Sequence, residues 1–181
     1  MVDFRPAPYF KMLHAIFAAL FLGAISTLGD FIWAALDLRH RVAYGLAHGA
    51  VICLCIGAVV GFRARRPVVG AAVGPLIGVL AASGFYLLAP SLRWAAMFPM
   101  WMLFWVCFAV LQAQLEGAHR WRAALVRGLA AAILSGLAFY AISGIWTRPS
   151  PGGPSYVRHF LSWTFAFLPG FAALFWKGRR R

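Results

Sequence analysis

The chain has 181 residues, of which 63% are hydrophobic and only 12% are charged, and its mean hydropathy is +0.80. A soluble domain carries roughly 25% charged residues, so this composition excludes a water-soluble globule. In a bilayer the apolar surface faces hydrocarbon and needs no polar cover. The composition therefore predicts an integral membrane protein.

Basic residues outnumber acidic residues by 17 to 4. In a soluble protein this excess would indicate a nucleic-acid partner. Here the cations lie in short segments between apolar stretches, where the positive-inside rule explains them. We therefore expect no nucleic-acid binding.

Six apolar stretches follow one another along the chain. They lie at about residues 12–36, 42–62, 68–89, 92–115, 123–146 and 159–176. Each is close to the roughly 20 residues that cross a bilayer as a helix. Arg5 and Lys11 resemble the start of a signal peptide, but the apolar stretch that follows is too long and has no clear cleavage site. We expect an all-α polytopic membrane protein, with residues 1–181 forming one domain of six transmembrane helices.

The cations also predict the orientation of the chain. An even number of spans puts both termini on one side, and 12 of the 17 basic residues fall on that side. By the positive-inside rule, that side is cytoplasmic. Short basic loops and Ala-, Arg- and Gly-rich usage are typical of a bacterial protein, so we expect a bacterial cytoplasmic membrane.

The second and third stretches carry small residues at every fourth position. The second has Gly45, Gly49, Cys53, Gly57 and Gly61, and the third has Gly70, Gly74 and Gly78. Such stripes let helix backbones approach closely in a membrane. The partner helix could belong to the same subunit or to another, and we expect a homo-oligomer, such as a trimer.

The fourth stretch carries bulky aromatic residues on one helical face. They are Trp94, Phe98, Trp101, Trp105 and Phe108, and the face continues to Gln112 and Glu116. This face either packs on neighbouring helices or walls an apolar ligand cavity, in which Gln112 would orient a polar group of the ligand. The predicted ligand-binding residues are Trp101, Trp105, Phe108 and Gln112, with Tyr140 and Phe167 on the opposite wall. Prolines within the spans, at Pro75, Pro99 and Pro169, favour bent helices that leave such a space.

Asp30 and His48 form the best candidate for an intramembrane polar pair. Ionisable side chains inside a membrane are costly and commonly functional. Asp30 lies seven residues before Asp37, and His48 lies seven after Arg41, so antiparallel helices would bring them level. The pair either carries chemistry or is a structural contact in a wet outer vestibule.

The sequence gives little material for catalysis or for a cofactor. It contains no HExxH, CxxC or GxSxG motif and no phosphate-binding loop. His48 and His159, with His40 and Asp30, could converge on the outer side, but the pattern does not indicate a metal or haem site. Cys53, Cys55 and Cys107 lie in apolar spans, where they serve as small packing residues. We expect no enzyme activity, no catalytic residues and no cofactor.

Two short stretches near the C-terminus are distinctive: the Ser150–Pro151 turn, and "SYVRHFLSWTFAFLPGF" at residues 155–171. Together they resemble the Insig (insulin-induced gene) family and its prokaryotic homologues. In the second, Tyr156, Val157, Arg158 and Leu161 are similar to the family's approach to its last span, and Phe165 and Gly170 are similar to the span itself.

The resemblance implies six helices around a lipid- or sterol-accommodating pocket, without catalytic activity. Eukaryotic members bind oxysterols in the endoplasmic reticulum membrane and hold sterol-sensing partners. This chain lacks their long polar N-terminal region, and only Glu116 lies near the place of their acidic residue before span five.

The leading hypothesis is a non-catalytic protein that binds a lipid or sterol-like apolar ligand between its helices. A small transporter or proton-coupled carrier that uses Asp30 and His48 is the first alternative. A membrane enzyme that modifies a lipid with the same pair is the second.

Overall fold

The structure is a computed structural model that describes residues 8–36, 40–117, 121–146 and 155–176. Within these ranges every regular element is helical, which confirms the predicted all-α class. The elements are α1 (Pro8–Leu36), α2 (Arg41–Arg63), α3 (Pro67–Leu92), η1 (Arg93–Ala96), α4 (Met97–Leu115), α5 (Trp121–Trp146) and α6 (Tyr156–Phe175). The predicted Ser150–Pro151 turn and both chain termini lie outside the described residues.

Five of the described helices, α1 to α5, are long and apolar enough to cross a membrane. The chain is therefore a membrane protein with transmembrane helices. α6 has 20 residues, but polar residues such as Arg158, His159, Ser162 and Thr164 interrupt its apolar sequence. Ser162 and Thr164 are buried against other helices, so these two side chains are hidden from the surroundings of the bundle.

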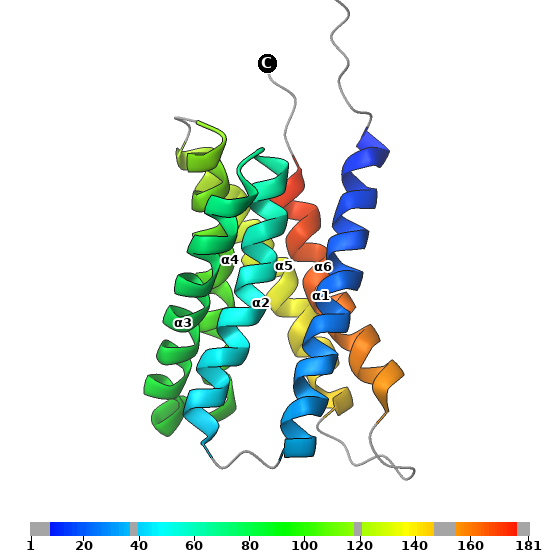
Figure 1. Cartoon of the computed structure of the whole chain (residues 1–181), viewed down its shortest axis with the longest axis vertical. Helices are drawn as coiled ribbons and strands as arrows, with labels where there is room; N and C mark the ends of the chain where they lie inside the picture. The colour runs from blue at the N-terminus through cyan, green and yellow to red at the C-terminus, as the bar shows by residue number, and fades with distance from the viewer. Residues whose placement is uncertain (1–7, 37–39, 118–120, 147–154, 177–181) are drawn as a thin grey trace, which may run out of the picture.

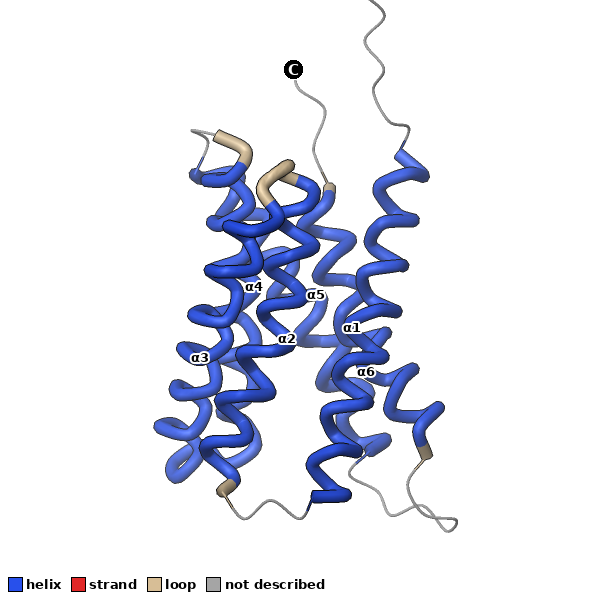
Figure 2. The backbone as a smooth tube through the Cα atoms, viewed as in Figure 1, coloured by secondary structure: helices blue, strands red, loops and turns tan. Residues whose placement is uncertain are grey.

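Consecutive helices run in opposite directions, and the start of α1 and the end of α6 lie at the same end of the bundle (Figure 1). α2 and α3 form one closely packed pair, and α1 and α6 form another. α5 lies against both α4 and α6. α1 and α2 make few contacts with each other although they are consecutive. Figure 2 shows how short the non-helical segments are among the described residues.

α2 and α3 pack backbone against backbone along their small-residue stripes. A Cβ added at Gly57 would lie 2.2 Å from the carbonyl oxygen of Gly70, and one at Gly74 would lie 2.1 Å from that of Cys53. These separations are far below van der Waals contact, so only glycine fits there. The stripes therefore meet within one chain, and this face of α2 and α3 is not free to bind a second copy.

The aromatic face of α4 packs largely on α6. Trp105 meets Phe171 edge to face, with ring centroids 5.3 Å apart. The Trp105 indole also lies directly on Gly170, where an added Cβ would come within 2.1 Å of a ring carbon. Trp105, Phe108 and Phe171 are fully buried. A glycine on one helix thus accommodates the largest side chain of the other.

The boundary between α3 and α4 corrects one expectation. α3 continues through Pro90 to Leu92 and ends where Arg93 adopts a φ of +51°. After η1, α4 begins at Met97, so Pro99 lies in the first helical turn, where proline removes no helical hydrogen bond. The prediction that Pro99 interrupts a span was therefore wrong, whereas Pro75 and Pro169 do lie inside α3 and α6.

Candidate functional site

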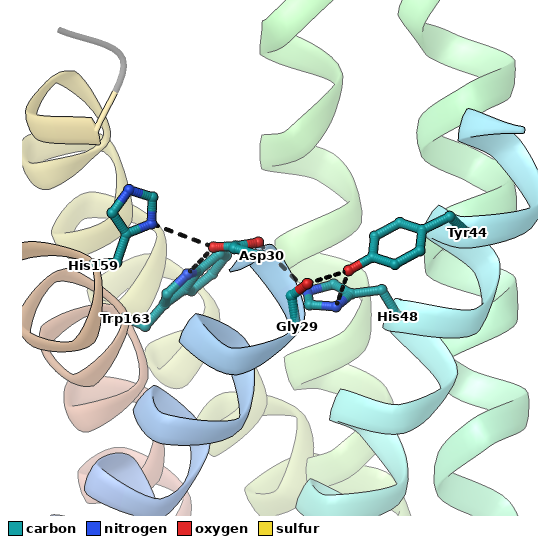
Figure 3. Close-up of polar contacts among 6 residues, drawn as sticks. All are labelled: Gly29, Asp30, Tyr44, His48, His159 and Trp163. Atoms are coloured by element: carbon teal, nitrogen blue, oxygen red, sulfur yellow. Dashed lines mark hydrogen bonds and ion pairs between the residues drawn. The ribbon is translucent and has the colours of Figure 1, made fainter. Parts of the chain in front are cut away.

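Asp30 of α1 lies between α2 and α6 and has polar neighbours on both (Figure 3). Its Oδ2 accepts a hydrogen bond from Nε1 of Trp163 at 2.8 Å and lies 3.5 Å from Nδ1 of His159. Its Oδ1 lies 4.0 Å from Nε2 of His48. We call Asp30, Tyr44, His48, His159 and Trp163 the polar cluster. It connects three helices through one carboxylate.

Tyr44 completes the cluster on the α2 side. Its hydroxyl donates a 2.5 Å hydrogen bond to the carbonyl oxygen of Gly29 and lies 3.4 Å from Nδ1 of His48. Gly29 also makes room for the imidazole, because an added Cβ would lie 2.4 Å from Cε1 of His48. The tyrosine and the glycine therefore fix the side of α1 on which His48 rests.

Helical spacing explains why these side chains meet. Tyr44 and His48 are four residues apart on α2, and His159 and Trp163 are four apart on α6, so each pair shares a helical face. The structure brings Asp30 and His48 together and adds His159, which the sequence placed on the same side. Sequence analysis missed Tyr44 and Trp163 as partners, although the two i, i+4 pairs were a visible signal.

The cluster moderates the cost of an acidic side chain inside a membrane protein. A buried carboxylate without partners is strongly unfavourable. Asp30 is 33% exposed, and the side chains of His48 and His159 are 21% and 23% exposed. One indole N–H at hydrogen-bond distance and two imidazoles within 4.0 Å therefore surround the carboxylate and reduce this cost.

A cavity of about 220 Å³ adjoins the cluster and lies between α2, α3, α4 and α6. Its walls combine small residues of α2 and α3 with aromatic residues of α3, α4 and α6. Among the lining residues are Gly49, Ala82, Phe85, Trp101, Phe104 and Phe167. His48 and Trp163 line the same cavity, so the polar cluster forms part of its wall. A mostly apolar cavity with a few converging polar groups is typical of a ligand site.

Buried hydrogen bonds hold the aromatic wall in place. Nε1 of Trp101 donates to Oγ of Ser135 at 2.9 Å, and that hydroxyl in turn donates to the carbonyl oxygen of Ala166. Trp101 stacks on Phe139 with ring centroids 4.7 Å apart. The indole that faces the cavity is thus oriented from α5 and α6.

The predicted ligand-binding residues do not all reach this cavity. Trp101 and Phe167 line it, whereas Trp105, Phe108 and Gln112 are fully buried in the packed core. Nε2 of Gln112 donates to Oε1 of Glu116 at 2.9 Å, away from the cavity.

Tyr140 lies apart from the other predicted residues. It is 64% exposed on α5 and packs on Phe98, with ring centroids 5.4 Å apart. It is not among the residues that line the cavity. The residues that line the cavity thus include the imidazole of His48 and the phenol of Tyr86, but not the amide of Gln112.

No three His, Cys, Asp or Glu side chains within the described ranges are arranged to hold a metal ion. His48 and His159 approach different oxygens of the same carboxylate, at ion-pair distances of 4.0 and 3.5 Å.

Comparisons with protein-family models, characterised proteins and solved structures find no match to this chain. The site is therefore interpreted from its own geometry.

Proposed function

We propose that this protein binds a lipid or sterol-like apolar ligand, without catalysis, in the cavity between α2, α3, α4 and α6. The observation that carries the proposal is that His48 and Trp163 belong both to the cavity wall and to the polar cluster. The apolar body of the ligand lies against Trp101, Phe104 and Phe167. A hydroxyl or carbonyl of the ligand reaches the imidazole of His48.

The dimensions of the cavity favour a slender ligand. Its volume of about 220 Å³ lies below the roughly 300–1,000 Å³ of pockets for drug-sized molecules. One acyl or isoprenoid chain, or part of a sterol, therefore fits better than a whole phospholipid. The aromatic side chains supply dispersion contacts, and the polar cluster selects for an end group that can form a hydrogen bond.

The proposal includes α6 as a sixth transmembrane helix, with both termini in the cytoplasm of a bacterium. At 1.5 Å per residue, the 20 residues of α6 span about 30 Å, the thickness of the hydrocarbon core. Its packing against α1 and α5 supports a full crossing. Arg63 ends α2, and Arg65 and Arg66 follow before α3, at the end of the bundle where α1 begins and α6 ends, in agreement with a cytoplasmic location.

Membership of the Insig family is part of the same proposal. Two of the residues that carry the resemblance have structural roles in α6: Gly170 accommodates Trp105, and the backbone N–H of Arg158 donates to Oγ of Ser155 at 3.3 Å, which caps the helix. These roles agree with a lipid-accommodating helical bundle.

Native mass spectrometry tests ligand binding directly. Ala82 lines the cavity on α3, whereas Ala72 is exposed on the same helix. Ala82→Leu fills part of the cavity, so the new side chain occupies space that the ligand needs and lowers its affinity. We expect a bound lipid in the wild type and in the control Ala72→Leu, and much lower occupancy in Ala82→Leu. Equal occupancy in the two variants, or no bound lipid in any protein, would refute the proposal.

A proton-coupled carrier is the second candidate, and the position of Asp30 between two imidazoles favours it. A carrier predicts substrate flux into liposomes that is lost in Asp30→Asn. Flux that persists in this variant would exclude the mechanism. A lipid-modifying enzyme would instead convert the bound lipid, which chromatography of the lipid after incubation detects.

A further inference from the structure

A second apolar groove lies outside the ligand cavity, between α1 and α2. Its volume is about 540 Å³, and it shares no lining residue with the cavity beside His48. The walls are nearly all hydrocarbon, and α1 contributes Phe17 and Phe21 while α2 contributes Leu54 and Phe62. These four side chains are 42–71% exposed. The groove exists because α1 packs on α6 and makes few contacts with α2.

The length of the groove matches one leaflet of a bilayer. Leu54 and Arg63 both line it and are nine residues apart on α2, which corresponds to about 13.5 Å along the helix. One leaflet contributes about half of the roughly 30 Å hydrocarbon core. Arg63 is the last residue of α2, so the groove runs from the end of the helix toward the middle of the membrane.

A cation lies at the end of this apolar groove where α2 ends. The guanidinium carbon of Arg63 is 4.2 Å from the ring centroid of Phe175, so the side chain is held over the aromatic face. Its Nε is buried and has no hydrogen-bond partner among the described residues. His14 lines the groove at the same end. A fixed, buried donor beside an apolar groove is suited to a ligand with an anionic head and hydrocarbon chains.

The charges near Arg63 favour an anion at this end. Arg65 and Arg66 follow in the connection to α3 and are both exposed. Glu116 is the acidic side chain that interacts electrostatically with Arg63. Among the described residues near Arg63, three arginines thus outnumber the one carboxylate that interacts with it, so an additional anion is still attracted there.

We propose that the groove between α1 and α2 is a binding site for an anionic glycerophospholipid of the adjacent leaflet. The phosphate accepts hydrogen bonds from Arg63, and the acyl chains lie along Phe17, Phe21 and Leu54. The site is independent of the ligand cavity beside His48. Variants of the groove should therefore displace only the anionic phospholipid. Variants of the cavity should displace only the ligand beside His48, so either proposal can fail without the other.

Native mass spectrometry with lipid titration tests the site. The probes are phosphatidylglycerol and phosphatidylcholine with identical acyl chains, together with soluble glycerol 3-phosphate. One arginine contact with an anionic lipid is worth roughly a fivefold change in affinity. We expect the wild type to prefer phosphatidylglycerol and Arg63→Gln to lose that preference. Arg66→Gln removes the same charge from an exposed position outside the groove and should weaken the preference much less than Arg63→Gln does.

Two further variants, and a control for the second, keep the test decisive if Arg63→Gln does not fold. Arg63→Lys keeps the charge and should retain the preference for phosphatidylglycerol. Ala58→Leu fills the groove and should weaken binding of both phospholipids, whereas Ala47→Leu, exposed on the same helix, should not. Equal binding of the two phospholipids to the wild type overturns the proposal, as does equal behaviour of the Arg63 and Arg66 variants. Glycerol 3-phosphate binding as tightly as the phospholipid would also overturn it, because the acyl chains would then contribute nothing.

Discussion

The contact between Gly170 and Trp105 gives a prediction that the structure makes quantitative. In Gly170→Ala the new Cβ would lie 2.1–2.5 Å from three atoms of the indole, which is fully buried and has no space to move into. Gly136→Ala is the matched control, because its Cβ would meet only one atom, at 3.9 Å. Both glycines lie inside helices, so both variants gain the same roughly 0.5–1 kcal/mol of helix propensity. The difference between them isolates the overpacking, which costs about 1–3 kcal/mol.

The assay is reversible unfolding in mixed micelles, followed by tryptophan fluorescence. We expect Gly136→Ala to be as stable as the wild type or slightly more stable, and Gly170→Ala to be less stable than this control by about 1–3 kcal/mol. Equal stability of the two variants would show that the Trp105 ring does not pack on Gly170. The packing of the Trp105 side chain of α4 on α6 would then have to be abandoned.

Two further predictions concern the contacts around the site, and a third concerns the oligomeric state. Trp163→Phe keeps an aromatic ring but removes the N–H that donates to Asp30. The free energy of unfolding should fall by at most about 1.5–3 kcal/mol, because the carboxylate is partly exposed and water replaces part of the lost hydrogen bond. An unchanged unfolding curve would contradict the contact. Ser135→Ala removes the hydroxyl between Trp101 and Ala166 and should cost about 0.6–1.7 kcal/mol, and Ser135→Thr, which restores a hydroxyl, should recover part of it. The sequence predicts a homo-oligomer, and the mass of the intact complex tests this: a monomer at all protein concentrations would exclude it.

The helices could be predicted from the sequence because long apolar stretches of about 20 residues are typical of helices in a membrane protein. All six predicted stretches coincide with helices, to within five residues at each end. The exceptions have local causes. The positive φ of Arg93 and the short η1 separate α3 from α4, and no hydropathy pattern encodes that backbone turn.

The position of the cavity could not be predicted, because the aromatic face of α4 is continuous while its surroundings are not. Trp101 and Trp105 are one helical turn apart on that face. Trp105 meets Phe171 and Gly170 of α6, whereas Trp101 borders the cavity beside α2 and α3. Periodicity identifies the face, but only the arrangement of the neighbouring helices decides which part of it borders open space.

The polar cluster was partly predictable because depth in the membrane limits which residues can meet. An acidic residue in an apolar stretch needs a partner at the same depth, and helix lengths give depth. This argument finds His48 for Asp30 and places His159 on the same side. It does not find Trp163, because an indole in an apolar helix needs no polar explanation until its neighbour is known.

The central claim is that an apolar ligand occupies the cavity next to His48. A high-resolution cryo-EM map of the protein in native lipid nanodiscs tests it most directly. We predict elongated density between α2, α3, α4 and α6, with a polar end within hydrogen-bond distance of His48. A map at the same resolution in which side chains close this space, or in which it contains only water, would contradict the claim.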